Sequence, residues 1–134
     1  MILGFKKQFP VKILIGEKII TIRTDKHNRW KPGRMIQFAT GVRTKQFNVF
    51  KLGICVSTQE ILITKSKEEG IYFIHIDKRF FYTYWKDKCK CDSDTEARML
   101  DLAKSDGFNS IEEFLQWFDK GIEGKIIHWT EKRF

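Results

Sequence analysis

Three polar residues with the types that nucleophilic chemistry uses, Lys18, Thr21 and Arg23, lie within six positions of one another. A threonine hydroxyl becomes a nucleophile when a nearby base removes its proton, and Lys18 is close enough in sequence to be that base. The lysine must then be partly deprotonated, which desolvation or a neighbouring cation such as Arg23 promotes. Arg23 can also bind a carbonyl or phosphate oxygen. The simpler interpretation is an ordinary β-forming threonine beside a solvated lysine.

The residues around this set predict a short helix, a turn and a strand. Pro10 suits the first turn of a helix, and Gly16 suits the left-handed position just after a helix ends. The alternation over 20–23 predicts a strand whose two isoleucines face the core and whose Thr21 and Arg23 face the opposite side. We place Lys18 in the turn before this strand, because a lone buried lysine is costly.

More strands than helices are predicted for the rest of the chain. Apolar alternation and β-branched residues indicate strands over 1–5, 34–40, 47–63, 71–76 (continuing toward Tyr82 or Trp85) and 125–130. Gly53 marks a bulge or bend in the longest of them. Two helices are expected, over 94–104 and from Ser110, where Ser110 and Glu113 form a capping box. The regular strand–helix alternation of a parallel sheet is lacking, which favours an α+β fold around a mostly antiparallel sheet or small β-barrel.

The composition is that of one folded domain spanning 1–134. Of the 134 residues, 42% are hydrophobic and 14% aromatic, which excludes a disordered chain. No apolar run reaches the roughly 18 residues that a membrane span needs, so no membrane partner is expected. The odd number of cysteines, three, excludes a complete disulfide framework within one chain and favours a cytoplasmic location.

A formal net charge of +8 attracts polyanions, which makes a nucleic acid or nucleotide-like ligand a plausible partner. The loop residues Arg29, Trp30 and Lys31 place an aromatic face between two cations, a set that suits stacking on a base while holding phosphate. The alternative is a tryptophan folded over the end of the domain. Lys6, in the basic stretch after the first strand, either lies beside the same ligand or belongs to a solvated turn.

Three motifs in order along the chain resemble the ASCH domain family of the PUA-like superfamily. The first is Gly16-x-Lys18-x-x-Thr21-x-Arg23, and the second is the turn and strand Lys31-Pro32-Gly33-Arg34-Met35-Ile36-Gln37-Phe38. The third is Ala103-Lys104-Ser105-Asp106-Gly107-Phe108 followed by Ser110-x-x-Glu113-Phe114. The resemblance spans nearly the whole chain and implies a small PUA-like β-barrel with a few helices packed around a cleft.

The resemblance also implies a catalytic set. Some bacterial members of the family are amidohydrolases that remove the acyl group from N4-acetylcytidine with a Lys, a Thr and a Glu. The Lys and Thr positions match Lys18 and Thr21, and the third matches Asp106, whose side chain is one methylene shorter than Glu. Arg23, Arg29, Trp30, Lys31 and Lys6 are then the candidate substrate-binding residues.

Three functional hypotheses follow. The first is an amidohydrolase acting on an acylated nucleoside, and the second is a non-catalytic RNA-binding module. In either case the domain is expected to be a monomer or weak oligomer. The third is a ribonuclease, for which neither a histidine pair nor a metal cluster argues. No cofactor or metal is expected, because the spacing of Cys89-x-Cys91 is not that of a zinc motif and no second pair accompanies it.

Overall fold

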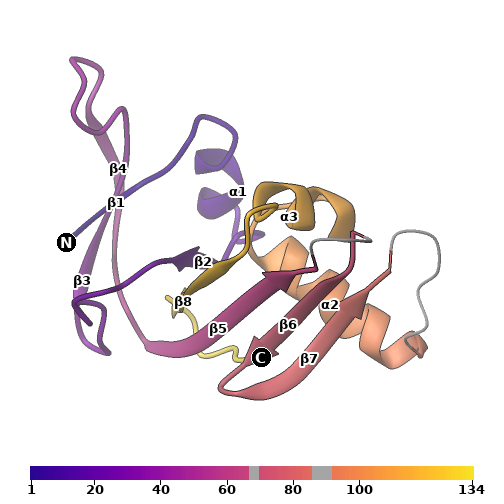
Figure 1. Cartoon of the computed structure of the whole chain (residues 1–134). Coiled ribbons are helices and arrows are strands. Elements are labelled where there is room, and N and C mark those ends of the chain that lie inside the picture. The colour runs from indigo at the N-terminus through magenta and orange to yellow at the C-terminus, as the bar shows by residue number, and fades with distance from the viewer. Residues whose placement is uncertain (67–69, 86–91) are drawn as a thin grey trace.

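The computed structural model describes residues 1–66, 70–85 and 92–134, which form an α+β protein with two sheets and three helices (Figure 1). The strands are β1 (Ile2–Gly4), β2 (Ile20–Arg23), β3 (Met35–Thr40), β4 (Asn48–Ile54), β5 (Ser57–Lys65), β6 (Tyr72–Ile76), β7 (Arg79–Tyr84) and β8 (Ile122–His128). The helices are α1 (Pro10–Leu14), α2 (Ser93–Ser105) and α3 (Ile111–Trp117).

The two sheets have the strand orders β1-β3-β4 and β2-β8-β5-β6-β7. All pairings are antiparallel except β1 with β3, which is parallel. The mostly antiparallel α+β fold is therefore confirmed. Within the described ranges the strand pairing does not close into a barrel, because each sheet ends in an edge strand.

The predicted strand over 47–63 is divided at Cys55 and Val56, where the chain passes from one sheet to the other. The Cys55 N–H donates to Arg34 O next to β3, whereas the Val56 N–H donates to His128 O of β8, both at 2.8 Å. Of the bulge or bend predicted at Gly53, the bulge is wrong, because the register of β3 with β4 shifts between Phe38 and Ala39 instead. Gly53 makes room for the Phe38 ring, since a Cβ there would lie 2.9 Å from it.

The predicted continuation of the strand over 71–76 toward Tyr82 or Trp85 is wrong. The chain turns back through Asp77 and Lys78, both left-handed with φ of 51° and 66°, and returns as the antiparallel strand β7. The predicted helices are present with small shifts. Helix α2 starts one residue before Asp94 and is capped by Asp92, whose carboxylate accepts from the Thr95 N–H. Ser110 caps α3 as predicted. The Glu113 carboxylate bonds the Asn109 N–H rather than that of Ser110.

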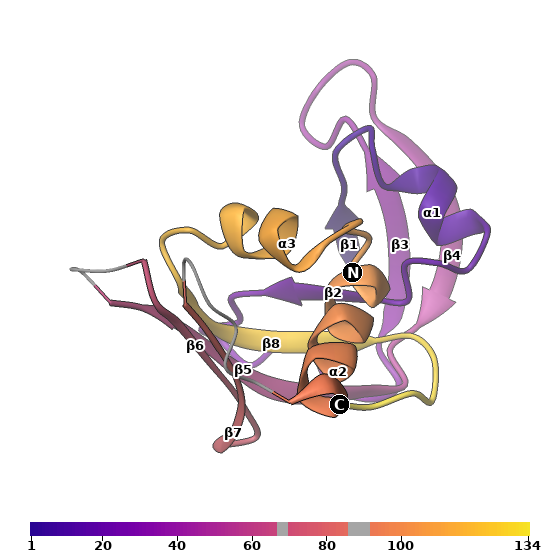
Figure 2. The same cartoon turned by 90° about the vertical axis from the view of Figure 1, so that its right-hand side faces the viewer.

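The helices lie on one side of the five-stranded sheet and enclose the core against it (Figure 2). Ile20 and Ile22 of β2 are buried in this core, as the alternation predicted, together with Ile126 of β8, Leu102 of α2 and Phe114 of α3. Burial of these aliphatic and aromatic side chains fixes β2 between the core and the turn that joins α2 to α3. In the described part of the chain, none of the helices has the length and apolar character that crossing a bilayer requires.

Candidate active site

A cavity of about 280 Å³ lies where the β1–α1 connection, β2 and the α2–α3 turn meet. Its volume is near the lower end of the range of about 300–1,000 Å³ that small-molecule sites occupy. All three predicted catalytic residues line it, Lys18, Thr21 and Asp106, and so do two of the five predicted binding residues, Arg23 and Lys6. Five aromatic residues, one isoleucine and one glycine complete the wall: Phe5, Phe9, Phe108, Trp117, Phe118, Ile22 and Gly4.

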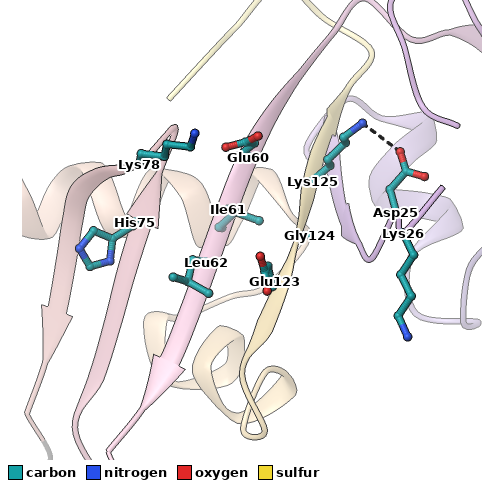
Figure 3. Close-up of a pocket in the computed structure, with 10 residues that line it drawn as sticks. All are labelled: Asp25, Lys26, Glu60, Ile61, Leu62, His75, Lys78, Glu123, Gly124 and Lys125. Atoms are coloured by element: carbon teal, nitrogen blue, oxygen red, sulfur yellow. Dashed lines mark ion pairs between the residues drawn. The ribbon is translucent and has the colours of Figure 1, made fainter. Parts of the chain in front are cut away.

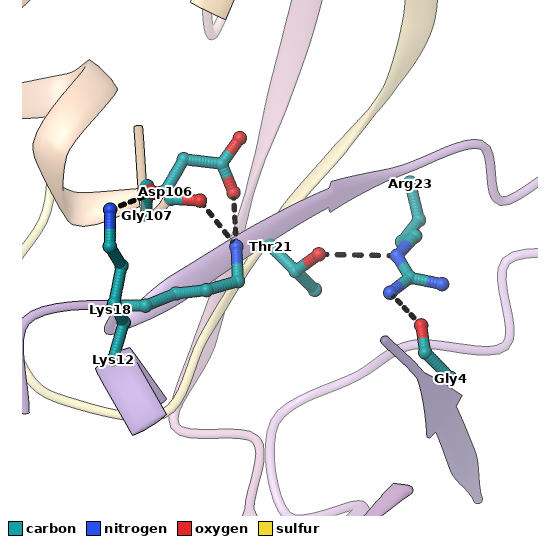
Figure 4. Close-up of polar contacts among 7 residues, drawn as sticks. All are labelled: Gly4, Lys12, Lys18, Thr21, Arg23, Asp106 and Gly107. Carbon is teal, nitrogen blue, oxygen red and sulfur yellow. Dashed lines mark hydrogen bonds and ion pairs between the residues drawn. The ribbon is translucent and has the colours of Figure 1, made fainter. Parts of the chain in front are cut away.

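Lys18 is positioned by the turn that follows α1. Its backbone N–H donates to Lys12 O at 3.0 Å, and Gly16 occupies the left-handed position after the helix with φ of 83°. The placement of Lys18 in this turn was predicted, but its burial was not, since only 2% of the residue is exposed. The ammonium group donates to Asp106 Oδ1 at 2.7 Å and to Asp106 O at 2.6 Å (Figure 4), which compensates the lost hydration.

Asp106 is held by the end of α2. It is the C-cap residue of that helix, and its N–H donates to Leu102 O at 3.0 Å. The next residue, Gly107, is left-handed with φ of 91°, and a Cβ there would lie 2.9 Å from the Phe9 ring and 3.0 Å from Lys18 Cδ. Glycine at position 107 therefore permits both the turn and the close approach of Lys18 to Asp106. Because the two residues lie so close, the Asp106 carboxylate contacts Lys18 although its side chain is one methylene shorter than that of Glu.

Burial dominates the protonation of this pair. It lowers the pKa of Lys18 below its usual value, against the opposing charge of Asp106. Burial likewise raises the pKa of Asp106, against the opposing effect of Lys18. The Lys18 ammonium also lies 4.7 Å from the centre of the Phe9 ring and 5.7 Å from that of Phe5. A proton that moves from Lys18 to Asp106 therefore costs less here than in water.

Thr21 and Arg23 form the second polar pair of the cavity (Figure 4). Arg23 Nε donates to Thr21 Oγ1 at 3.1 Å, and Arg23 Nη2 donates to Gly4 O at 2.6 Å. The guanidinium carbon lies 5.1 Å from the centre of the Phe5 ring. Because Oγ1 accepts this bond, the hydroxyl hydrogen of Thr21 is free to be donated toward a base or a ligand.

Lys12 contributes to the site although the sequence analysis did not select it. Lys12 Nζ reaches from α1 to the α2–α3 turn, where it donates to Gly107 O at 2.8 Å and to Asn109 Oδ1 at 2.9 Å. It thereby holds the turn that carries Asp106, and its charge lowers the pKa of Lys18 further. No local pattern marks this role, because Lys12 and Gly107 are 95 residues apart in sequence.

The aromatic wall was also missed, and it includes the mouth of the cavity. Phe9 and Phe108 pack edge to face with ring centres 5.7 Å apart, and each also contacts Trp117. Trp117 remains 44% exposed. Lys6 Nζ lies 5.0 Å from the centre of its ring, which gives the mouth an aromatic face beside a cation. In the sequence these rings follow the spacing of ordinary core residues, so only the fold distinguishes them.

The predicted stacking loop of Arg29, Trp30 and Lys31 does not line the cavity. Trp30 is only 6% exposed and belongs to the core, so the expectation that its ring stacks on a base is wrong and the folded-in alternative holds. Asp25 fixes this loop, because its carboxylate accepts from the N–H groups of Arg29 and Trp30 at 2.8 and 2.9 Å. Arg29 and Lys31 are exposed on the surface.

A wider hollow of about 860 Å³ lies over the outer face of the five-stranded sheet (Figure 3). Lys125 of β8 pairs with Asp25 there at 3.0 Å. Six of the ten lining residues are acids or lysines, and the full set is Asp25, Lys26, Glu60, Ile61, Leu62, His75, Lys78, Glu123, Gly124 and Lys125. Since none of them carries a hydroxyl or thiol, this hollow lacks a nucleophile of the kind that the smaller cavity holds.

No cluster of three or more His, Cys, Asp or Glu side chains suited to a metal ion occurs in residues 1–66, 70–85 and 92–134. Cys89 and Cys91 lie outside the described residues, and Cys55 is a buried free thiol. Comparisons with family models, curated proteins and solved structures found no match to this chain. The assignment of the cavity therefore depends on its own geometry and on the motifs of the sequence.

Proposed function

We propose that this chain is an ASCH-type, nucleoside- or RNA-binding domain that hydrolyses an acyl amide on a modified nucleoside such as N4-acetylcytidine. The observation that carries the proposal is the convergence of a buried Lys18–Asp106 pair and a Thr21–Arg23 pair on one aromatic cavity. A nucleophile, a base and a cationic group for the developing negative charge are the parts that acyl transfer requires.

We also interpret the two sheets as the walls of an open PUA-like barrel. The chain joins them directly at Cys55 and Val56. On the other side, Arg23 of β2 bonds to Gly4 O of β1, which brings the first strand of each sheet together beside the cavity. In this interpretation the cavity lies at the opening between the two walls, where a ligand can enter.

In the first step, Thr21 Oγ1 attacks the acyl carbonyl carbon. The Thr21 proton passes to a neutral Lys18 amine, which forms when the Lys18 ammonium gives a proton to the Asp106 carboxylate. The lowered pKa of Lys18 and the raised pKa of Asp106 favour this transfer. Arg23 supplies positive charge beside the tetrahedral oxyanion.

In the second step, the tetrahedral adduct expels the N4 amine of cytidine, which takes a proton from Lys18. Water then attacks the threonyl ester and gives its proton to Lys18. The new adduct expels Thr21 Oγ1, which takes the proton back from Lys18, and the acyl group leaves as a carboxylic acid. Asp106 then returns its proton to Lys18, which restores the starting ion pair. One water molecule is consumed for each amide bond that is cleaved.

The test is release of cytidine from N4-acetylcytidine, followed chromatographically. Thr21→Ala and Lys18→Ala should each lower the rate by roughly 100-fold or more, since a nucleophile or general base contributes about 10²–10⁴-fold. Thr58→Ala is the matched control, because Thr58 and Thr21 pair with the same residue, Ile127, on opposite sides of β8. Turnover that survives both Thr21→Ala and Lys18→Ala would exclude this mechanism.

The second candidate function is a non-catalytic RNA-binding module. It is favoured by the net charge of +8 and by the pairing of Lys6 with the exposed ring of Trp117 at the cavity mouth. Salt-sensitive binding of single-stranded RNA without release of cytidine would support it over the hydrolase. Binding that is unchanged in Lys6→Ala and Trp117→Ala would place RNA elsewhere on the surface.

A further inference from the structure

The three-stranded sheet has one buried face and one apolar face that is left open. Leu3, Ile36 and Phe38 are buried on the inner face. Alternate residues on the same strands point the other way, as the two-residue period of a strand requires. Four of them are large, aliphatic or thioether side chains that are 47–63% exposed, and we call them the outer apolar face: Ile2, Met35, Leu52 and Ile54.

These four side chains occupy neighbouring register positions on one face. Met35 pairs directly with Ile54 across β3 and β4, while Ile2 and Leu52 both pair with Gln37 from its two sides. Neighbouring strands lie about 4.8 Å apart, so the four apolar side chains surround the single polar side chain of Gln37. The helices lie on the opposite side of this sheet (Figure 1), and within the described ranges none covers the outer apolar face.

The five-stranded sheet also has a face that none of the described helices covers, but that face carries charged side chains. The outer face of the five-stranded sheet carries Glu60, Glu123 and Lys125 among its lining residues (Figure 3). An open sheet face normally alternates in this way, with polar side chains toward water. The outer apolar face departs from that pattern, and contiguous exposed apolar surface of this kind marks an interaction site.

The edges of the three-stranded sheet are poor templates for an added strand. The edge strand β1 has only three residues, and the pairing of β4 with β3 shifts register in its middle. Short and irregular edges disfavour strand addition. The face rather than an edge is therefore the docking element. A helix with an apolar stripe packs on a sheet face without needing a further sheet, so it is the smallest element that fits.

The charges near this face select an acidic partner. Arg34 directly precedes Met35 at one end of this face, and Arg43 and Lys45 occupy the exposed turn between β3 and β4 at the other end, so positive charge lies at both ends of the sheet. In the described part of the chain none of these three cations takes part in an ion pair. A second copy of the chain would bring the same positive charge to this face, which disfavours self-association. Nucleic acid is disfavoured because aliphatic side chains offer no aromatic surface on which bases can stack.

We propose that the outer apolar face binds an acidic amphipathic helix of a partner protein. The apolar stripe of that helix packs on Met35, Leu52 and Ile54, and its carboxylates approach Arg34 and the cations of the β3–β4 turn. Such an interface is small, because it involves a single helix. Its affinity falls as the salt concentration rises, because part of the attraction is between exposed charges.

The test uses a fluorescently labelled helical peptide of about four turns, with leucines spaced three and four residues apart and glutamates elsewhere. Fluorescence anisotropy with the full chain should show saturable binding that weakens with added salt. The double variant Leu52→Asn and Ile54→Asn should weaken binding by roughly tenfold or more. Leu62→Asn, which changes an exposed leucine of the other sheet, is the matched control and should bind as the unaltered chain does.

Four results would overturn the proposal. The first is that the acidic peptide does not bind, and the second is that the double variant binds it with unchanged affinity. The other two are that a peptide with lysine in place of every glutamate, or one with the same composition in scrambled order, binds equally well. Sedimentation of the chain alone is the further measurement. A dimer that disappears in the double variant would assign the face to a second copy instead.

Discussion

Two lysine–aspartate pairs with similar separations differ in their surroundings. Lys18 and Asp106 lie 2.7 Å apart, and their side chains are only 2% and 4% exposed. Lys125 and Asp25 lie 3.0 Å apart, and 18% of the Lys125 side chain remains exposed. The first pair faces the aromatic cavity, whereas the second fixes the loop before β3 at the edge of the larger hollow.

The aspartates respond in opposite directions because they have different donors. Burial acts to raise the pKa of Asp25, but hydrogen bonds from the N–H groups of Trp30 and Arg29 and from Lys125 outweigh it and leave that pKa lowered. Burial also acts on Asp106, and Lys18 does not outweigh it, so its pKa is raised. A carboxylate with several donors is a stable structural ion, whereas one with a single buried donor can exchange a proton.

Among the substitutions that test this comparison, removal of Lys18 should lower the free energy of unfolding the most. Lys18→Met leaves the Asp106 carboxylate buried without its cation, and breaking a buried pair in this way costs about 3–5 kcal/mol of unfolding free energy. Burial raises the pKa of Asp106, and in the variant Lys18 no longer opposes this effect, so acid can protonate the carboxylate and remove the buried charge. The loss should therefore be smaller at pH 5 than at pH 7, as measured by urea unfolding.

The double variant Lys18→Met and Asp106→Leu is the control for this prediction. Replacing both members of a buried pair with apolar residues is often nearly neutral, so it should recover most of the lost stability. It should not recover turnover of N4-acetylcytidine, because both proton-transfer groups are gone. A Lys18→Met variant as stable as the unaltered chain would show that Asp106 is not buried as a charge.

Protonation of His128 should have the next largest effect on stability. Its contribution to acid unfolding must be measured separately from those of Asp25 and Asp106, because all three groups can titrate as the pH falls. Burial, assisted by the charge of Arg133, lowers the pKa of His128 from 6.5 to about 4. The stability linked to this lowered pKa is present above pH 6.5 and is lost as the pH falls toward 4, because only the unfolded chain binds the proton readily. The loss amounts to about 3 kcal/mol. His128→Gln should remove this part of the acid dependence in urea unfolding at several pH values, and an unchanged pH profile would contradict the assignment.

Removal of Lys125 should have a smaller effect than removal of Lys18. In Lys125→Met, the Asp25 carboxylate keeps the N–H donors of Arg29 and Trp30, so the expected loss is about 1 kcal/mol at pH 7. The lowered pKa of Asp25 supplies stability that is present above its unfolded value of 3.8 and is lost as the pH falls through the lowered value. Urea unfolding of Lys18→Met and Lys125→Met at the same pH compares the two pairs directly. Equal losses of unfolding free energy would refute the distinction between a proton-exchanging pair and a structural pair.

The smallest expected effect belongs to Lys12, and it depends on the proposed hydrolase function. Lys12→Met removes a charge that lowers the pKa of Lys18, so the rise of cytidine release with pH should move to higher pH, with a few-fold loss of kcat/KM at neutral pH. Lys12→Arg should retain the profile. Lys7→Met changes an exposed lysine near α1 and should leave it unaltered. A lowered rate with no shift of the pH profile would assign Lys12 a purely structural role.

Local features of this fold could be predicted from the sequence, since their causes are local. Pro10 and Gly16 bound α1, and the alternation over β2 places its isoleucines in the core. The burial of Lys18 could not be predicted, because the carboxylate that compensates it is 88 residues away. A lysine considered alone is correctly expected in water, and only the fold supplies Asp106.

Partners that are distant in sequence or lie on side chains also explain two other differences from the sequence predictions, the division of the strand over 47–63 and the burial of Trp30. The residues over 47–63 favour strand throughout, and the division at Cys55 arises from pairing with Arg34 and His128 in different sheets. Trp30 has the neighbours of a stacking residue, but the carboxylate of Asp25 binds the loop N–H groups and turns its ring into the core. In both cases a distant or side-chain partner decides between two conformations that the local pattern allows equally.

The position of Trp117 also makes the cavity observable by light. Its indole stands 44% exposed at the mouth, beside the Lys6 ammonium, whereas the indole of Trp30 is enclosed in the core. A ligand that enters the cavity changes the solvent and the charge around Trp117 and leaves Trp30 untouched. The emission of the unlabelled protein should therefore report occupancy of the cavity, and the part of the signal that Trp117→Phe removes identifies the ligand as bound at this mouth.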